Sequence, residues 1–434
     1  MAAGLGTRMR SSVPKHLHPV LGRRMVDWVL AAAGELGADP LVVVASPETA
    51  PLLEGTSGIE IAVQDEPHGT GDAVRSARTA LEGRADDVLV LSGDTPRLTG
   101  ALLADLVATH RAGDAAATVL TFEPDDARAY GRVIRGADGN VVAIVEARDA
   151  TPEQLAVRES NSSIYVFRSE LLWPVLDRIE PANAQQEVYL TDAVRLLAED
   201  GLTVTAHVAP DPDETEGVNT RVELAAAARA LRDRVNEGHM LAGVTLVDPE
   251  TTWIEPDVEI EPDVVVHPFV VLRGATRVHT GAEIHSQTVA IDAVIGPGAM
   301  VGPFCYLRPG TVLEAGAKAG TFVEIKNAQV GAGAKVPHLS YIGDAEIGEG
   351  TNIGAGSITA NFPHQPGKPK GRTTIGRNVR VGVDTVFDAP VEVGDDAWTA
   401  AGSVITDDVP DKALAIARAR QENKEGYADR QRDG

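Results

Sequence analysis

The sequence predicts two folds in one chain, a Rossmann-like α/β domain followed by a parallel β-helix, and three observations lead to this prediction. Residues 1–217 alternate short apolar runs with helix-like segments, which is typical of a doubly wound sheet. Residues 242–410 carry large apolar residues at six-residue intervals, which is the repeat of stacked short strands. The length of 434 residues exceeds one ordinary core, and we expect a linker helix at 218–241 and a polar tail at 411–434.

Two apolar runs in the first half predict buried parallel strands. Residues 40–46 (PLVVVAS) and 87–94 (DVLVLSGD) are short, and turn-forming residues close them. Residues 73–83 and 100–113 have apolar side chains at helical spacing and lie between strands. From Thr118 onwards, strands joined by short turns predict antiparallel ribbons added to the sheet.

The six-residue repeat defines the inward positions of the second half. Small or β-branched residues follow four positions after the large ones, which predicts a prism with an apolar interior. Residues 361–373 (NFPHQPGKPKGRT) interrupt the repeat and are expected to loop out. The large positions are Ile254, Ile260, Val266, Leu272, Val278 and Ile284, then, after a phase shift, Ile295, Val301, Leu307, Leu313, Ala319 and Ile325.

Composition excludes several classes of protein. The formal net charge of −24 argues against a general nucleic-acid binder, although a small phosphorylated substrate needs only a few local cations. Cys305 is the only cysteine, so we expect no intramolecular disulfide, a buried apolar filler and a reducing compartment. There is neither an apolar run long enough to span a bilayer nor a signal-peptide pattern, so we expect no membrane partner and a cytoplasmic protein.

The opening loop AAGLGTRM carries the first candidate site. Gly4 and Gly6 let the backbone turn its amides toward phosphate, and Arg8 and Lys15 add positive charge. Each signal is weak alone, and together they favour phosphate binding. Asp94 ends an apolar strand at the edge where such sheets bind ligands; the residues alone leave open a metal ligand or an Asx-turn residue.

The second half carries its own candidate site. Arg308 and Lys326 are 18 residues apart, one full turn of three hexads, so the two cations should stack on one face and attract an anion. His338 comes two hexads after Lys326, and histidine is the natural general base near neutral pH. A lone histidine is more often a turn residue, so this role needs further support.

These motifs resemble known families. AAGLGTRM…PK with SGDTP and GVN is similar to the sugar-1-phosphate nucleotidyltransferases. Joined to a hexapeptide helix, residues 2 to 427 resemble the bifunctional enzymes that unite uridylyl transfer to N-acetylglucosamine-1-phosphate with acetyl transfer to glucosamine-1-phosphate. The resemblance implies a left-handed β-helix, a homotrimer, and roles in UDP-N-acetylglucosamine and peptidoglycan synthesis.

The resemblance also implies roles for single residues of the first half. Mg²⁺ would be held by Asp94 and Asn219, and Arg8 and Lys15 would act on the phosphates of UTP. The nucleotide would be bound by Ala2, Ala3, Gly4, Gly6, Lys15, Gln64, Gly69 and Thr70, and the sugar phosphate by Gly131, Glu146, Asn161 and Asn219.

For the second half, the resemblance implies that His338 removes a proton from the acceptor amine as the amine attacks the thioester of acetyl-CoA. The acceptor would be bound by Arg308, Lys326, Tyr341, Asn352 and Asn361, and acetyl-CoA by Ala355, Val383, Ala401 and Arg418.

Several positions depart from the family pattern. Ser163 and Val383 stand where the family has glycine and serine, and NFPH (361–364) replaces NYDG. The lysine that follows this run can be placed on Lys368 or Lys370. The strand that normally precedes the glycine loop is absent, which predicts an apolar gap and an unpaired edge, and we expect the native start to lie upstream of Met1.

Two alternatives to the bifunctional enzyme follow from these departures and from the residues. The first is a single-activity sugar-1-phosphate nucleotidyltransferase whose β-helix is structural or regulatory. The second is a non-catalytic sugar-nucleotide-binding scaffold. A paired Asp94 and Asn219 argues against the scaffold, because binding alone does not need a metal site.

Overall fold

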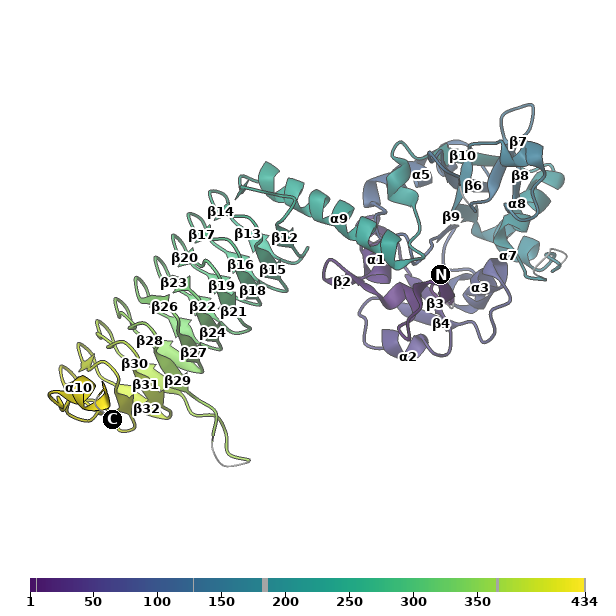
Figure 1. The fold of residues 1–434 in the computed structure, drawn as a ribbon. Coiled ribbons are helices and arrows are strands. Elements are labelled where there is room, and N and C mark those ends of the chain that lie inside the picture. The colour runs from purple at the N-terminus through teal and green to yellow at the C-terminus, as the bar shows by residue number, and fades with distance from the viewer. Residues whose placement is uncertain (5, 128, 182–185, 364–366, 433–434) are drawn as a thin grey trace. The chain divides into compact units, whose positions relative to one another are not determined.

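The computed structural model describes residues 1–434 except 5, 128, 182–185, 364–366 and 433–434. The chain forms two compact units, Met1–Leu231 and Arg232–Gly434. The helix α9 (Arg221–Leu241) occupies the stretch for which the sequence predicts a linker helix (Figure 1). Among the described residues, no helix is both long and apolar enough to cross a bilayer.

The first unit contains a mixed sheet with helices packed on it. The sheet runs in the order β10-β6-β9-β7-β8, and β5 pairs with β9. Two further pairs of strands lie outside this sheet: β3 and β4 are parallel, and β1 (Pro19–Val20) and β2 (Arg23–Arg24) are antiparallel. The strands are β3 (Val42–Ala45), β4 (Glu60–Val63), β5 (Asp87–Val90), β6 (Ala117–Phe122), β7 (Arg132–Arg135), β8 (Val141–Val145), β9 (Ser160–Arg168) and β10 (Val204–Val208). The main helices are α1 (Met25–Glu35), α3 (Thr70–Ser76), α5 (Gly100–Ala112), α7 (Ser169–Leu176) and α8 (Leu190–Glu199).

The prediction of parallel strands is correct for β3 and wrong for β5. β5 runs antiparallel to β9, with Asp87 opposite Arg168. The reason lies in β9, a long buried strand that returns from the antiparallel ribbon β7–β8 and inserts between β5 and β6. An apolar run predicts burial on both faces, and it does not determine the direction of the partner strand.

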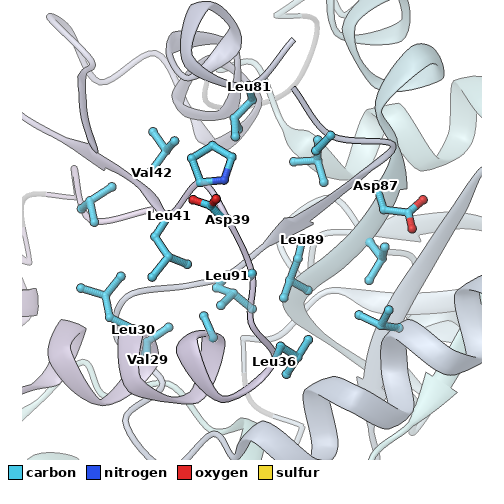
Figure 2. A pocket seen from close by; sticks show the side chains of 18 of the residues that line it. Val29, Leu30, Leu36, Asp39, Leu41, Val42, Leu81, Asp87, Leu89 and Leu91 are labelled. Carbon is cyan, nitrogen blue, oxygen red and sulfur yellow. The ribbon is translucent and has the colours of Figure 1, made fainter. Parts of the chain in front are cut away.

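A groove with a volume of about 390 Å³ lies between β3 and β5. Most of the residues that line it are apolar, and Figure 2 shows Leu30, Leu41, Leu89 and Leu91 around it. At its end, Ala2 N donates to Val44 O of β3 (2.7 Å), and Gly93 N, which follows β5, donates to Met1 O (2.9 Å).

The second unit is a parallel β-helix, as predicted. Among the described residues its strands form three parallel sheets, stacked rung upon rung and consistent with the left-handed form (Figure 1). The sheets run from β11 (Thr245–Leu246) to β26 (Lys335–His338), from β12 (Trp253–Ile254) to β34 (Val404–Ile405), and from β13 (Glu259–Ile260) to β32 (Val391–Val393). The last pair joins β33 (Trp398–Thr399) to β35 (Leu414–Ala415), so strand pairing continues past residue 410. The exposed helix α10 (Tyr427–Arg432) lies in the predicted tail.

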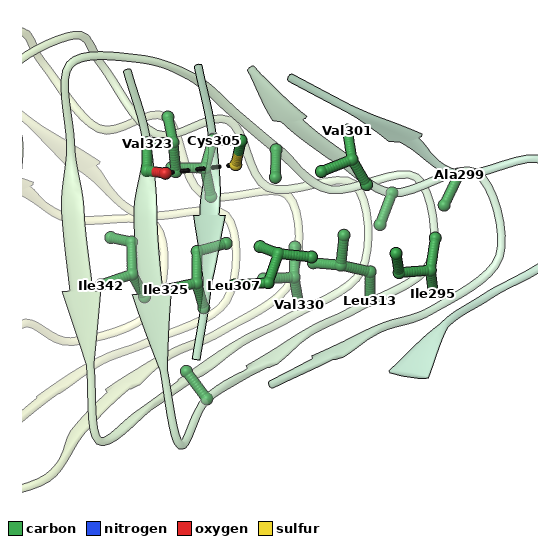
Figure 3. Close-up of a cluster of buried hydrophobic side chains, with 14 of the residues drawn as sticks. Ile295, Ala299, Val301, Cys305, Leu307, Leu313, Val323, Ile325, Val330 and Ile342 are labelled. Carbon is green, nitrogen blue, oxygen red and sulfur yellow. Dashed lines mark hydrogen bonds between the residues drawn. The ribbon is translucent and has the colours of Figure 1, made fainter. Parts of the chain in front are cut away.

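The twelve large inward positions that the repeat predicts are buried except Ile260, which is partly buried and packs against the core. Leu307, Leu313 and Ile325 are fully buried, and burying one such side chain stabilises the fold by about 1.5–3 kcal/mol. Cys305 is the expected buried filler; its Sγ donates to Val323 O at 3.1 Å, and burial raises its pKa to about 12 (Figure 3). Between β29 (Ile358–Ala360) and β30 (Thr373–Ile375), the described residues contain no strand, as expected for the loop.

Candidate active sites

Four polar side chains from three parts of the first unit converge on one point. The Lys15 ammonium forms an ion pair with Asp94 Oδ2 and donates to Asn219 Oδ1 at 3.0 Å. Arg8 Nη2 also donates to Asn219 Oδ1, at 2.8 Å. The chain brings them together because Val218 N donates to Asp94 O (2.8 Å), which ties the start of α9 to the end of β5. The structure therefore joins the two candidate metal ligands to the two candidate phosphate-binding cations.

The electrostatics of this cluster favour an ionised Asp94. Burial acts to raise the pKa of Asp94, but the Lys15 ammonium, His16 and hydrogen bonds from Lys15 and Ser92 outweigh it, and the pKa falls to about 2. Ser92 Oγ donates to Asp94 Oδ1 at 2.6 Å. His16 is 4% exposed, and burial lowers its pKa to about 4 despite the nearby Asp94 charge. His16 is therefore neutral at pH 7.

The opening loop is shaped by one glycine in particular. Gly6 has φ 60°, and a Cβ there would lie 2.5 Å from Lys15 Cβ, so the loop approaches Lys15 too closely for any other residue. Gly4 is exposed, and a Cβ there would meet only His16 Cε1, at 3.7 Å. Ala2 and Ala3 are buried, and the amide of Ala2 is used in pairing with β3.

Helix α9 begins two residues after Asn219 and fixes the position of Asn219. Glu223 Oε2 accepts from Asn219 N at 2.7 Å and from Thr220 N at 2.9 Å, while Glu223 N donates to Thr220 Oγ1. This reciprocal capping satisfies the first amides of the helix. The Asn219 side chain is consequently held toward Lys15 and Arg8.

The candidate nucleotide-base residues lie where β4 leads into α3. Gln64 is buried, and its Nε2 donates to Gly69 O (3.1 Å) and Asp72 Oδ2 (2.8 Å). Gly69 has φ 111°, and a Cβ there would lie 2.6 Å from Val188 O. Thr70 Oγ1 accepts from Leu190 N at 3.0 Å, so this hydroxyl links α3 to α8.

Three of the four candidate sugar residues, Gly131, Glu146 and Asn161, lie together beside β7, β8 and β9, whereas Asn219 lies in the cluster of Lys15 and Asp94. Asn161 N donates to Gly131 O at 2.9 Å, and a Cβ on Gly131 would lie 3.5 Å from Glu146 Oε1. Burial, followed by the charges of Asp149 and Asp192, raises the pKa of Glu146. Ser163 stands where the family has glycine, and its backbone adopts φ 62°, a conformation that favours glycine.

The donor set of the first cluster fits a magnesium ion. A carboxylate and a side-chain amide oxygen both face one cation, the Lys15 ammonium. Oxygen ligands of this kind are the ones that Mg²⁺ prefers, usually with phosphate oxygens and water in the remaining positions.

The second unit places its candidate cations together. Leu307 and Ile325 are register partners, so Arg308 and Lys326, which directly follow them, lie on neighbouring rungs of one sheet, as the 18-residue spacing predicts. Lys370 lowers the pKa of Lys326 through a hydrogen bond and through its charge, with a further contribution from Arg308. Of the two candidates on the loop, Lys370 is therefore the lysine beside Lys326.

A polar network surrounds these cations. A Cβ on Gly343 would lie 2.4 Å from the Tyr341 hydroxyl oxygen and 2.8 Å from Asn361 Nδ2, so this glycine makes room for both candidate acceptor residues. Asp344 accepts hydrogen bonds from Asn361 and from Asn327 (2.6 Å). Burial acts to raise the pKa of Asp344, but these two amides, Lys370 and Lys326 lower it overall.

The candidate acetyl-CoA residues line up with His338. Lys335, Asn352, Arg380 and Trp398 are successive register partners, so the residues three positions later also occupy successive rungs. These residues are His338, Ala355, Val383 and Ala401. Arg418 directly follows Ala417, whose carbonyl accepts from Val404 N on the next rung. Asn352 itself lies on the sheet of Lys335, whereas Tyr341 lies on the next sheet.

Two residues of these clusters, His16 and Asp344, are missing from the sequence-based set, and a third, Lys370, is there only as an alternative to Lys368. No sequence motif marks His16, and only its burial distinguishes it from an ordinary turn histidine. Asp344 sits in a turn with φ 48°, where aspartate is common, so no sequence signal marks it. Choosing Lys370 over Lys368 requires the path of the loop, which the sequence does not give. His364, one of the departures in NFPH, lies outside the described residues.

The fold and the two clusters define a class, an α/β nucleotidyltransferase joined to a hexapeptide-repeat β-helix. The model of the MobA-like NTP transferase domain matches residues 1–129. The bifunctional protein GlmU of Streptomyces coelicolor is 50% identical over 456 residues, covering 100% of this chain and 94% of that protein. Those of Mycobacterium tuberculosis (48% identical; 100% and 92% covered) and Thermobifida fusca (47%; 100% and 94%) are similar. The chain belongs to the family of the bifunctional protein GlmU.

Proposed function

We propose that the chain makes UDP-N-acetylglucosamine for cell-wall synthesis through two activities. The first unit transfers uridylyl from UTP to N-acetylglucosamine-1-phosphate and releases pyrophosphate. The second unit transfers acetyl from acetyl-CoA to glucosamine-1-phosphate. The observation that carries this proposal is the convergence of Lys15, Asp94 and Asn219 beside the glycine loop, in a chain whose relatives are named bifunctional.

In the first unit, the cluster is suited to bringing two anionic substrates together. Asp94 and Asn219 would hold Mg²⁺, which when bound neutralises phosphate charge. Lys15 and Arg8 bind phosphate oxygens and stabilise the charge that develops during transfer. Gln64 faces the uracil of UTP, and Glu146 and Asn161 hold the acceptor sugar.

In the second unit, His338 accepts a proton from the acceptor amine as the nitrogen attacks the thioester carbonyl and the CoA thiolate leaves. Arg308 and Lys326 bind the phosphate of the acceptor, and Tyr341 and Asn361 orient its sugar ring. The column of Ala355, Val383 and Ala401, ending near Arg418, accommodates the extended acetyl-CoA.

The proposal includes a homotrimer working in the cytoplasm, where UTP and acetyl-CoA are available. Its support is an exposed apolar column on successive corners of the β-helix, in which Phe304 and Phe322 stack at 5.0 Å and Leu339 is 63% exposed. Phe362, on the loop, is 75% exposed. Such apolar surface is suited to burial against another copy of the chain.

Two assays on the same preparation test the proposal. Pyrophosphate release is measured with UTP and N-acetylglucosamine-1-phosphate, and release of the CoA thiol with acetyl-CoA and glucosamine-1-phosphate. Turnover in both assays is expected. Pyrophosphate release alone would favour the single-activity alternative, and turnover in neither would favour the scaffold.

A further inference from the structure

Two histidines and a glutamate meet on the outer face of the β-helix, at a place that the two activities do not use. His267 directly follows β14 (Val265–Val266), while Glu283 begins β17 (Glu283–Ile284) and His285 follows it. Val266 and Ile284 are fully buried, and side chains alternate along a strand, so the three polar side chains point outward. The strands β20 (Met300–Val301) and β23 (Lys318–Thr321) separate this rung from β26, which carries His338.

The three side chains converge on a small volume. His267 Nε2 lies 2.9 Å from Glu283 Oε1, and His285 Nε2 lies 3.8 Å from the same oxygen. The two imidazole rings are stacked, with centroids 4.9 Å apart and an interplanar angle of 19°. One ligand atom from each residue can be chosen so that all three lie within 4.8 Å of one another.

We propose that His267, Glu283 and His285 bind a divalent transition metal ion such as Zn²⁺, with water completing the coordination. Two imidazole nitrogens and one carboxylate oxygen are a common zinc donor set, with metal–ligand bonds of about 2.0–2.2 Å. In a tetrahedron with such bonds, neighbouring ligand atoms lie about 3.3 Å apart. The observed 2.9 Å and 3.8 Å between the nitrogens and the carboxylate oxygen bracket that separation, and binding would require the two stacked imidazoles to rotate toward one ion.

The donor chemistry separates this site from the one at Asp94 and Asn219. Mg²⁺ prefers oxygen ligands and is poorly served by two imidazoles, whereas Zn²⁺, Co²⁺ and Ni²⁺ bind imidazole well. The ion would connect two consecutive rungs of one sheet, because His267 follows β14 whereas Glu283 and His285 lie at the two ends of β17. Its position is independent of both proposed reactions.

The competing explanation is an ordinary histidine–glutamate pair, and the chain provides a matched example. His279 Nδ1 lies 2.9 Å from Glu261 Oε1, the same distance as His267 from Glu283. Within the described residues, that pair has no second imidazole in a cluster of three potential ligands. It therefore reproduces the ion pair without the proposed metal site.

The experiment uses the full chain without a histidine tag, stripped of metal and kept in millimolar Mg²⁺. Co²⁺ is titrated in while its visible absorption is recorded, and Zn²⁺ binding is measured by calorimetry. We expect one ion per chain. H285Q and H267Q should weaken binding by more than the roughly 10–100-fold that loss of an outer-sphere partner costs, while H279Q should leave it unchanged.

Circular dichroism and thermal unfolding of each variant show that its β-helix is folded. Absence of stoichiometric binding at micromolar Co²⁺ and Zn²⁺ would overturn the proposal, and so would binding that survives in H285Q. A loss in H279Q equal to the loss in H285Q would also overturn it, because non-specific surface binding would then explain the titration.

Discussion

The two cation clusters of the chain differ in the charges that meet there. In the first unit, Lys15 and Asp94 carry opposite charges, and their side chains are only 11% and 13% exposed. In the second unit, Lys326 meets another cation, Lys370, near the solvent-facing surface of the β-helix. Buried opposite charges depend on each other for stability, whereas exposed like charges are relieved by water and most of all by an anion. The first cluster is therefore coupled to folding, and the second to ligand binding.

The comparison of the two clusters predicts that substituting Asp94 causes the largest loss of activity. Asp94→Asn removes the charge that pairs with Lys15 and a candidate metal ligand, so we expect kcat for uridylyl transfer to fall by about 10²–10³-fold or more. Pyrophosphate release at saturating UTP measures this. Acetyl transfer by the same preparation is the control and should stay at its original rate, because the second unit has its own site.

Unchanged pyrophosphate release in Asp94→Asn would show that the Asp94 carboxylate is not needed for catalysis, and would contradict its assignment as a metal ligand. A parallel loss of both activities would instead indicate general unfolding, since breaking a buried pair costs about 3–5 kcal/mol. Thermal unfolding of the variant distinguishes a folded, inactive chain from an unfolded one.

Coupling of the first cluster to folding predicts a specific pH dependence through His16. Its pKa is about 4 in the folded chain and 6.5 in the unfolded chain, so between these values the unfolded state binds more protons. The free energy of unfolding should therefore fall as the pH drops from 6.5 to 4, by about 3 kcal/mol. Asp94 affects the free energy of unfolding in a lower pH range. Its lowered pKa stabilises the folded chain above the ordinary pKa of 3.8, and this stabilisation is lost as the pH falls toward 2.

Urea unfolding between pH 7 and pH 4 checks the His16 prediction. His16→Gln should flatten most of the slope, while His279→Gln, at a half-exposed histidine of the β-helix, should leave the slope in place. An equal slope in wild type and His16→Gln would show that His16 is not the group responsible.

The exposed cluster predicts an effect on binding. Replacing Lys326 or Lys370 by Met removes a cation facing the proposed phosphate, and hydrogen bonds to charged groups contribute about 1.5–3 kcal/mol. We expect KM for glucosamine-1-phosphate to rise about 10–100-fold, with weaker salt dependence and little change in thermal stability.

Lys368→Met is the matched control on the same loop and should leave KM close to the original value. A larger effect at Lys368 than at Lys370 would reverse the assignment that the structure favours. A loss of stability in Lys326→Met would contradict the distinction between the two clusters.

The features that could be predicted from the sequence are those that recur at a regular spacing along the β-helix. The six-residue repeat identifies inward residues such as Leu307, and the 18-residue interval stacks Arg308 on Lys326, because each rung repeats the same geometry. The direction of β5 could not be predicted in this way, since it depends on β9, about seventy residues away in the chain. The roles of Asp344 and Lys370 depend on turn and loop paths that carry no period.

The smallest expected effect is on the free energy of unfolding, at Ser163, which stands where the family has glycine. Ser163 has φ 62°, where a side chain is strained, so Ser163→Gly should raise the free energy of unfolding by about 0.5–1 kcal/mol. The bond from Ser163 N to Asn161 Oδ1 (3.1 Å) needs no side chain and should persist. The neighbouring Ser162→Gly is the control: it removes the Oγ that donates to Leu120 O at 2.6 Å, so it should destabilise by about 1–3 kcal/mol. If both substitutions destabilise in urea unfolding, strain at residue 163 does not explain the departure, and the sugar-binding edge needs its serine for another reason.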